Sequence, residues 1–202
     1  MRSRPLAVAG AFVFTPDVFP DERGFFVSPM QQLALLDTTG QASFPAVQVN
    51  ISRSRLGVVR GIHFTRTPPG CAKYVYCPQG QALDIVVDIR VGSPTFGRWD
   101  TVLLDPETAR AVYFPVGVGH AFVALTDPAT MSYIITASYD PDNELAVSVT
   151  DPALALPIPP DIEPIMSARD KVAPTLAEAE AAGLLPDYAT CQALAEQWVT
   201  SP

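Results

Sequence analysis

The sequence predicts an all-β fold, an antiparallel sandwich or barrel, with short helices near the C-terminus. Short runs rich in Val, Ile, Tyr and Phe recur along the chain. Turn residues separate these runs, since 21 prolines and 12 glycines are spread over the 202 residues. Strands spaced in this way are typical of antiparallel sandwiches and barrels, and the length suits one domain covering residues 1–202.

The individual strands are expected where β-branched and aromatic residues lie between turn signals such as "GSPTFG" and "DPDN". A strand-like stretch covers residues 58–76, and the other expected strands are 73–77, 82–91, 99–104, 111–115, 120–125 and 131–139. Within 82–91, Asp84 and Asp88 are four residues apart, so both would lie on the same face of a strand. That face would suit a polar barrel interior.

Helical patterns are expected mainly after residue 174. "TLAEAEAAGLLP" combines strong helix formers with Thr175 as N-cap, Glu178 three residues later, and Gly183 as a stop signal. Residues 189–199 predict a second helix, and residues 30–40 predict an earlier short one. The Pro-rich segment between the barrel and these helices, "LPIPPDIEPIMS", is expected to be an extended connection.

The composition limits the possible functions. A net charge of -8 disfavours binding to nucleic acids or anionic membranes, although a local group of arginines could still hold a small anion. No run of about 18 apolar residues predicts a membrane span. The three cysteines, Cys71, Cys77 and Cys191, form no CxxC pair, and their odd number favours reduced thiols and a cytoplasmic location.

The segment "VVRGIHFTRTPPGCAKYVY" places Arg60, His63 and Lys73 close together in a chain that has only two histidines. Such a group predicts an anion site or a proton-transfer site, unless the segment is simply a strand pair with a polar outer face. The second histidine, His120, begins a strand after a turn that contains Gly117 and Gly119. Both histidines could lie at the mouth of a barrel, where binding sites are common, or each could be structural.

Two kinds of chemistry fit these residues. A metal site could use both histidines with Asp84 or Glu144, but Arg60 and Lys73 would repel a cation, and no metal is expected. Proton transfer next to a carbonyl requires a base near neutral pKa, an acid on the opposite face and a group that stabilises the enolate. Histidine, tyrosine and lysine can fill these three roles.

Several segments, taken in order, resemble one known family. "RGIHF", "AKYVYCPQGQALDIVVDIRVGSPTFGRWDTVLL", "YFPVGVGHAFVALTD", "SYIITASYDPDNE" and "MSARDKVAPTL" are similar to the dTDP-4-dehydrorhamnose 3,5-epimerases. Members of this family are dimeric cupin-type barrels of nucleotide-sugar biosynthesis. The resemblance implies a cupin-like antiparallel β-barrel (jelly roll) with its core at about 45–150, an N-terminal dimer-contact segment and a C-terminal helical extension.

The resemblance also implies the catalytic residues of an epimerase that needs no cofactor. His63 matches the general base that removes the proton alpha to the C4 ketone, and Asp170 matches the carboxylate that orients this base. Tyr133 matches the acid on the opposite face of the sugar. Lys73 matches the group that stabilises the enolate, and His120 matches a second histidine of the site.

The other matched positions imply contacts to a dTDP-linked 4-keto-6-deoxy sugar. They are Arg60 and Arg169 for the diphosphate, Gln48 and Asn50 for polar contacts, Tyr139 and Glu144 near the thymine, and Asp84 inside the barrel. Two further residues, Arg23 and Phe26 of "DERGFF", match positions that reach into the partner's site, so the resemblance implies a homodimer with exchanged N-terminal segments.

The sequence departs from the family near the expected rim of the site or the expected dimer contact. Ala121 replaces the usual Gly after the second histidine, "LPIPP" replaces a Trp-Pro segment, and "VSPM" follows "RGFF". These changes leave the regiochemistry open, because relatives in antibiotic-sugar pathways epimerise C3 or C5 alone. The first rival hypothesis is therefore a monofunctional 3-epimerase. Two further rivals are a non-catalytic nucleotide-sugar binder and a metal-dependent cupin oxygenase.

Overall fold

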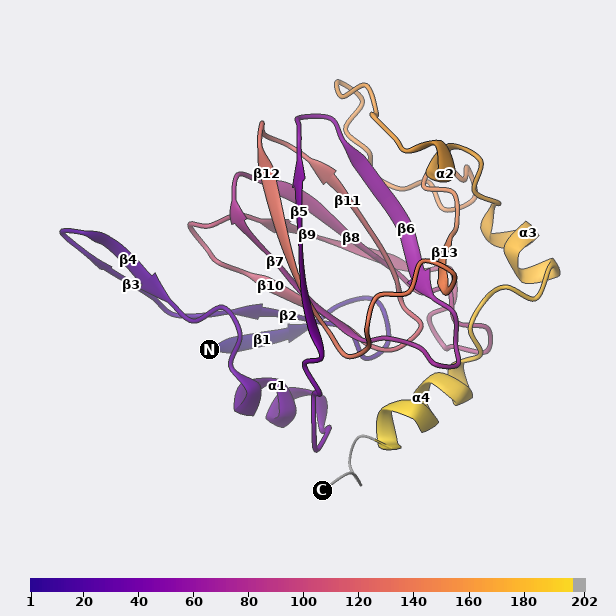
Figure 1. Cartoon of the computed structure of the whole chain (residues 1–202), viewed down its shortest axis with the longest axis horizontal. Helices are drawn as coiled ribbons and strands as arrows, with labels where there is room; N and C mark the ends of the chain where they lie inside the picture. Colours follow the sequence, from indigo (N-terminus) through magenta and orange to yellow (C-terminus); the bar gives the residue numbers. More distant parts are fainter. Residues whose placement is uncertain (198–202) are drawn as a thin grey trace.

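The structure is a computed structural model that describes residues 1–197, and two large antiparallel sheets form its body (Figure 1). The six-stranded sheet has the order β1 (Arg2–Pro5), β2 (Phe12–Thr15), β10 (Ala111–Phe114), β7 (Lys73–Gln79), β12 (Ala129–Ile135) and β5 (Gln48–Ser54). The five-stranded sheet has the order β13 (Glu144–Ala146), β6 (Val59–Thr65), β11 (Gly119–Ala124), β8 (Ala82–Val87) and β9 (Trp99–Leu104). The predicted all-β class is confirmed.

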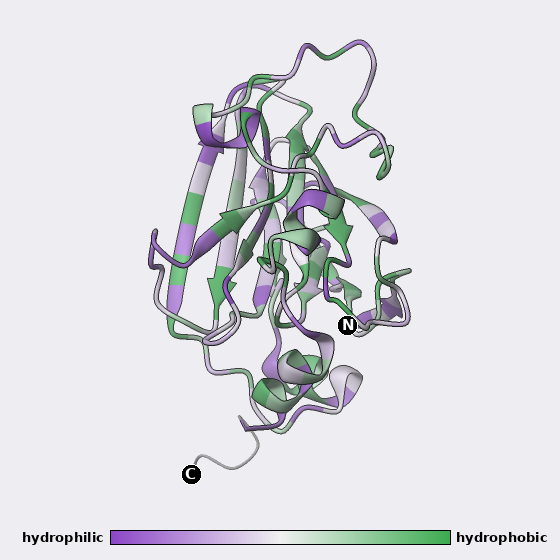
Figure 2. Ribbon diagram, turned by 90° about the vertical axis from the view of Figure 1, so that its right-hand side faces the viewer, coloured by the Kyte–Doolittle hydropathy of each residue, from purple (hydrophilic) through white to green (hydrophobic). Residues whose placement is uncertain are grey.

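The two sheets bury one apolar layer between them. Buried side chains of β7 and β10, such as Val75 and Val112, belong to one cluster with Val86 and Phe122 of the other sheet. The edge strand β5 alternates exposed and partly buried residues, because successive side chains point to opposite faces, whereas β10 and β11 are buried along their whole length. Figure 2 shows hydrophobic and hydrophilic residues side by side on the strands. The cavity that holds the candidate site interrupts this apolar layer.

The outer faces of both sheets are covered by helices and loops. Helices α1 (Gln32–Thr39) and α4 (Tyr188–Gln197) contribute Leu35 and Cys191 to a cluster with Tyr74 of the six-stranded sheet. On the other side, α3 (Leu176–Ala181) and the preceding loop pack on the five-stranded sheet. Buried clusters thus pack against both sheets around the cavity.

The predicted helices are confirmed, and one more is present. Thr175 and Glu178 form the expected capping box at the start of α3. The second predicted helix begins at Tyr188, and its last two predicted positions, 198 and 199, lie outside the described residues. The unpredicted helix α2 (Ala168–Lys171) is a single turn whose N-cap is Ser167. No helix in residues 1–197 is long and apolar enough to cross a membrane.

The N-terminal segment adds strands that the sequence did not indicate. Strands β1 and β2 extend the six-stranded sheet beyond the expected core, and β3 (Val18–Asp21) pairs with β4 (Gly24–Val27) in a separate hairpin. Figure 1 shows this hairpin projecting from the body. Phe19, Phe25 and Phe26 of the hairpin are exposed. An apolar composition like this one would ordinarily indicate a buried segment.

The prediction that Asp84 and Asp88 share a strand face is wrong. Strand β8 ends at Val87, so Asp88 lies in the following loop. There its carboxylate accepts hydrogen bonds from Arg90 at 2.8 Å and Ser93 at 2.6 Å, and it fixes the turn that leads to β9. Asp84 remains in the strand and is fully buried.

Candidate active site

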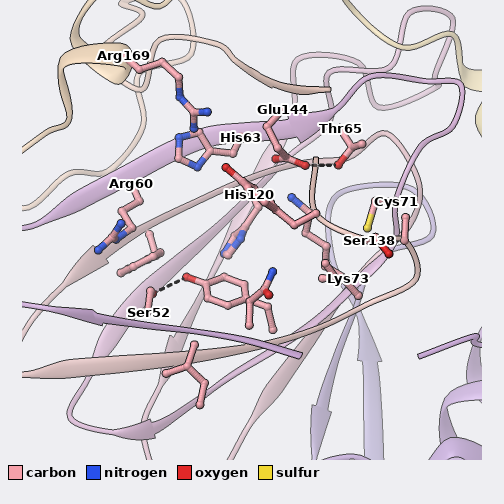
Figure 3. Close-up of a pocket in the computed structure, with 17 residues that line it drawn as sticks. Ser52, Arg60, His63, Thr65, Cys71, Lys73, His120, Ser138, Glu144 and Arg169 are labelled. Carbon is pink, nitrogen blue, oxygen red and sulfur yellow. Dashed lines mark hydrogen bonds between the residues drawn. The ribbon is translucent and has the colours of Figure 1, made fainter. Parts of the chain in front are cut away.

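A cavity of about 260 Å³ lies between the two sheets and receives side chains from both (Figure 3). Nine residues singled out from the sequence line it: Asn50, Arg60, His63, Lys73, His120, Tyr133, Tyr139, Glu144 and Arg169. Its walls combine cationic, phenolic and imidazole groups with apolar side chains such as Ile135 and Phe122. A concave site of this kind suits a small polar ligand.

His63 and Asp170 form a hydrogen-bonded pair at the edge of the cavity. His63 is on β6, and its Nε2 lies 2.7 Å from Oδ1 of Asp170, 107 residues later in the chain. The short helix α2 presents Asp170, whose backbone N–H is capped by Ser167. Because a carboxylate accepts the Nε2 proton, the lone pair of the imidazole remains on Nδ1.

The environment of this pair favours a neutral imidazole beside an ionised carboxylate. Burial lowers the pKa of His63 below 6.5, and the hydrogen bond and charge of Asp170 oppose that shift only in part. Burial alone would raise the pKa of Asp170, but the hydrogen bond and charge of His63 and the bond from Ser167 bring it below 3.8. At neutral pH His63 can therefore act as a base.

We expect the imidazole of His63 to titrate below pH 6.5, because burial disfavours its charged form. The variant Asp170→Asn should titrate at a still lower pH, because the neutral amide no longer favours the imidazolium. NMR titration of isotope-labelled histidine measures both, with the His63 signal assigned by its loss in His63→Ala. A wild-type midpoint at or above 6.5 would show that the charge of Asp170 outweighs the burial of His63, contrary to this expectation.

The second histidine forms a matching but deeper pair. His120 is on β11, and its Nε2 lies 2.6 Å from Oδ1 of Asp84 on the neighbouring strand β8. Burial raises the pKa of Asp84 above 3.8, against the charge and hydrogen bond of His120. Asp84 lies behind His120 and does not line the cavity, so it orients the imidazole that does.

Tyr133 and Lys73 enter the cavity from the other sheet. Tyr133 is on β12, its ring lies 5.9 Å from the ring of His120, and its hydroxyl lies 3.0 Å from Oγ of Ser52. Burial raises the pKa of Tyr133, so the phenol keeps its proton at neutral pH. Lys73, at the start of β7, pairs in register with Ile135, two residues after Tyr133. One cavity therefore holds a base from the five-stranded sheet and a phenol from the six-stranded sheet.

Two arginines give one side of the cavity a positive charge. Arg60 is on β6, three residues before His63, and its Nε donates to Oγ of Ser54 at 3.2 Å. Arg169 is on α2, next to Asp170, and its Nε lies 3.7 Å from that carboxylate. Figure 3 shows both arginines on the same side of the cavity as His63. This pair suits the binding of a phosphate-bearing ligand.

The remaining predicted residues of the barrel form the polar walls. Gln48 lies next to the cavity, where its Nε2 donates to Asn50 at 2.6 Å and its Oε1 accepts from the backbone N–H of Tyr139 at 3.0 Å. Glu144 accepts a hydrogen bond of 2.7 Å from the hydroxyl of Thr65. These bonds fix side chains that could contact a planar base and a sugar.

Arg23 and Phe26 do not join this site within one chain. Both lie on the projecting hairpin, and Arg23 pairs with Asp21 at 2.6 Å while its side chain is 84% exposed. Neither lines the cavity of its own chain. Any contact they make with a bound ligand would therefore have to be in another copy of the chain.

Sequence reasoning missed other residues of the cavity: Ile51, Ser52, Thr65, Cys71, Phe122, Ile135, Ala137 and Ser138. Serine and threonine are common on strand surfaces, so Ser52 and Thr65 gave no distinct signal. The alternation in "QVNISRS", polar at every second position, could have indicated that Ser52 shares a face with Gln48 and Asn50.

The described residues contain no group of three or more His, Cys, Asp or Glu side chains placed to hold a metal ion. Each histidine of the cavity instead binds its own carboxylate, and Lys73 and Arg60 line the same cavity. The site is thus a set of proton-donating and proton-accepting groups beside an anion-binding surface. Fold and site together define a cupin-type barrel equipped for acid–base chemistry on an anionic ligand.

Comparison with known proteins identifies the family. The model of the family "dTDP-4-dehydrorhamnose 3,5-epimerase" matches residues 5–178, so the chain belongs to this family. It is 47% identical over 196 residues to the dTDP-4-dehydrorhamnose 3,5-epimerase of Mycolicibacterium smegmatis, covering 97% of this chain and 96% of that protein.

Two further relatives are named as enzymes that act at one carbon. A dTDP-4-dehydro-6-deoxyglucose 3-epimerase from Streptomyces sp. is 47% identical over 188 residues, 93% of this chain and 95% of that protein. The crystal structure of a 3'-monoepimerase from Streptomyces bikiniensis, in complex with dTDP-quinovose, superposes with a TM-score of 0.93 at 44% identity. The match covers 98% of this chain and 100% of that one, and it confirms the predicted cupin-like jelly roll.

Proposed function

We propose that this protein is a cofactor-independent epimerase of dTDP-4-keto-6-deoxyglucose. It inverts C3, C5 or both by removing the proton alpha to the C4 ketone and returning one to the opposite face. The observation that carries the proposal is that His63 and Tyr133 enter one cavity from opposite sheets. Membership of the epimerase family, with relatives named for both 3,5- and 3-epimerisation, supports the same substrate class.

In the first step, Nδ1 of His63 takes the proton from the carbon next to the ketone. Asp170 holds the ring by its Nε2 proton and stabilises the imidazolium that forms. The electrons of the broken C–H bond move to the C4 oxygen and give an enolate. The ammonium of Lys73, with His120 beside it, stabilises this negative charge, and a donor in such a position contributes roughly 3–4 kcal/mol.

In the second step, the hydroxyl of Tyr133 gives its proton to the same carbon from the other face of the sugar. The enolate collapses to the ketone, the carbon is inverted, and tyrosinate remains. Burial keeps Tyr133 protonated until the enolate forms, since the pKa of the phenol is raised. The same two groups can act at the second alpha carbon if the sugar turns within the cavity.

The rest of the cavity would hold the nucleotide. Arg60 and Arg169 bind the diphosphate, for which the planar guanidinium groups offer paired donors. Tyr139 and Glu144 face the thymine by stacking and hydrogen bonding, and Gln48 with Asn50 completes the polar wall. Three free, buried cysteines support a reducing, cytoplasmic location.

We also infer a homodimer in which each hairpin β3–β4 reaches the other chain. Phe19, Phe25 and Phe26 of the hairpin are exposed, and so are Val49 and Ile51 of the edge strand β5. Apolar groups on a projecting hairpin and a free sheet edge are covered when two copies exchange hairpins. Arg23 could then reach the cavity of the partner.

Phe26→Asp is expected to shift the protein from dimer to monomer, because it places a charge on a side chain that is 67% exposed in one chain and covered in the proposed dimer. Sedimentation velocity over a range of concentrations measures the change. Leu103→Asp, on the edge strand β9 of the other sheet, is the matched control and should remain dimeric. A monomeric wild-type protein at micromolar concentration would refute the exchange.

Proton NMR of the enzyme with dTDP-4-keto-6-deoxyglucose in D2O tests the proposed function. Deuterium at both C3 and C5 of a product that is inverted at both carbons identifies a 3,5-epimerase. Deuterium at C3 alone identifies a 3-epimerase that gives a 4-keto-6-deoxy-allose, the second candidate, which the relatives named for C3 favour. No exchange at either carbon, with the nucleotide sugar bound, would show a non-catalytic binder.

A further inference from the structure

Strand β5 presents a row of polar side chains to the active site. Along Gln48–Ser54, polar residues alternate with Val49, Ile51 and Arg53, which are exposed, and Ile51 also borders the cavity. Each inward polar residue bonds a residue of the site: Gln48 bonds Asn50 and the backbone of Tyr139, Ser52 bonds Tyr133, and Ser54 bonds Arg60. Polar residues recur at every second position, as on one face of a strand, and this face forms part of the cavity wall.

The contact between Ser52 and Tyr133 involves the proposed acid directly. In the register of β5 and β12, Tyr133 pairs with Asn50 and Ser52 pairs with Met131, so the tyrosine side chain reaches its diagonal neighbour. The two hydroxyl oxygens are 3.0 Å apart, and the dashed line from Ser52 in Figure 3 marks this bond. Within residues 1–197, Ser52 is the hydrogen-bond partner of the Tyr133 hydroxyl, and either oxygen can be the donor.

A phenol has one proton and can donate it to one acceptor at a time. If Tyr133 donated to Ser52, its proton would point away from the sugar. If Ser52 donates instead, the proton of Tyr133 is free to point into the cavity, and the serine hydroxyl also stabilises the tyrosinate that remains. The hydrogen bond from Ser52 opposes the raising of the Tyr133 pKa by burial, which agrees with this second role.

We propose that Ser52 is a positioning residue for proton return, which donates its hydroxyl proton to Tyr133 and thereby directs the Tyr133 proton at the sugar. The inference rests on the proposed epimerase function. The Tyr133 O–H bond breaks as the new C–H bond forms, and the tyrosinate accepts the bond from Ser52. The cycle closes when His63 releases the proton it took to bulk water and the tyrosinate takes one from bulk water.

The test compares Ser52→Ala with Ser52→Thr, which keeps the hydroxyl. Two rates are followed by NMR in D2O: formation of the epimer, and deuterium uptake into starting sugar that is recovered without inversion. Loss of the donor should slow epimer formation roughly 10- to 100-fold, the usual effect of a hydrogen bond to a charged group. Deuterium uptake into starting sugar depends on His63 and should stay near the wild-type rate.

Ser52→Thr is expected to restore epimer formation to within a few-fold of wild type. The matched control is Thr130→Ala on β12, which removes a surface hydroxyl bonded to Gln79 outside the cavity and should change neither rate. If Ser52→Ala slowed both rates equally, or neither, the positioning role would be refuted. The positioning role would also be refuted if Ser52→Thr took up deuterium into starting sugar but formed little epimer. A wild-type protein with no exchange at all would instead overturn the epimerase function.

Discussion

Replacing His63 with alanine is expected to lower the turnover of dTDP-4-keto-6-deoxyglucose about 10²–10⁴-fold, the usual contribution of a positioned base. Proton abstraction needs a neutral group in the cavity, and burial keeps the imidazole of His63 in that form. In the proposed mechanism His120, paired with the buried Asp84, stands beside Lys73 at the enolate and does not take over the role of His63. Steady-state kinetics measure the loss.

Binding of dTDP provides the control for His63→Ala. Arg60 and Arg169 remain in place, so the variant should bind dTDP as the wild type does, as calorimetry would measure. Turnover within a few-fold of wild type, with unchanged binding, would remove His63 from the mechanism. Weak binding together with low turnover would point to damage of the cavity instead.

Tyr133→Phe is expected to lower epimer formation by a similar factor, about 10²–10⁴-fold. The variant keeps the ring and its contact with His120 at 5.9 Å but removes the hydroxyl that returns the proton. The matched control is Tyr76→Phe, which removes a phenol on β7 outside the cavity lining and should leave turnover unchanged. Kinetics of epimer formation that match the wild type would exclude Tyr133 as the acid.

Much of the fold was predictable, because it depends on local patterns. Apolar runs between turn residues located the strands from residue 73 to residue 135, and Thr175 with Glu178 located a helix start. Strands β1 to β5 and β13 were not among the predicted strands, since β1 to β4 and β13 are short and β5 alternates polar residues with apolar ones. The end of β8 at Val87 was missed because Asp88 is satisfied by Arg90, a contact that apolar periodicity does not reveal.

The candidate site was also predicted only in part. The motif resemblance implied its residues and the pairing of His63 with Asp170, whereas residue patterns alone could not have joined two positions 107 residues apart. Ser52 was missed because a serine on a strand carries no chemical signature until its partner is known. Arg23 and Phe26 lie outside the cavity of their own chain, so their proposed role depends on a second copy.

The base and the acid of the proposed mechanism act on opposite faces of the sugar. The most direct test of this central claim is the isotope pattern in sugar recovered from Tyr133→Phe in D2O. The side chain of His63 is 24% exposed, so the proton it takes can exchange with solvent before it returns to the same face. We expect deuterium in starting sugar of unchanged configuration, and none in sugar recovered from His63→Ala. Inverted product from Tyr133→Phe, or exchange that persists in His63→Ala, would contradict the claim.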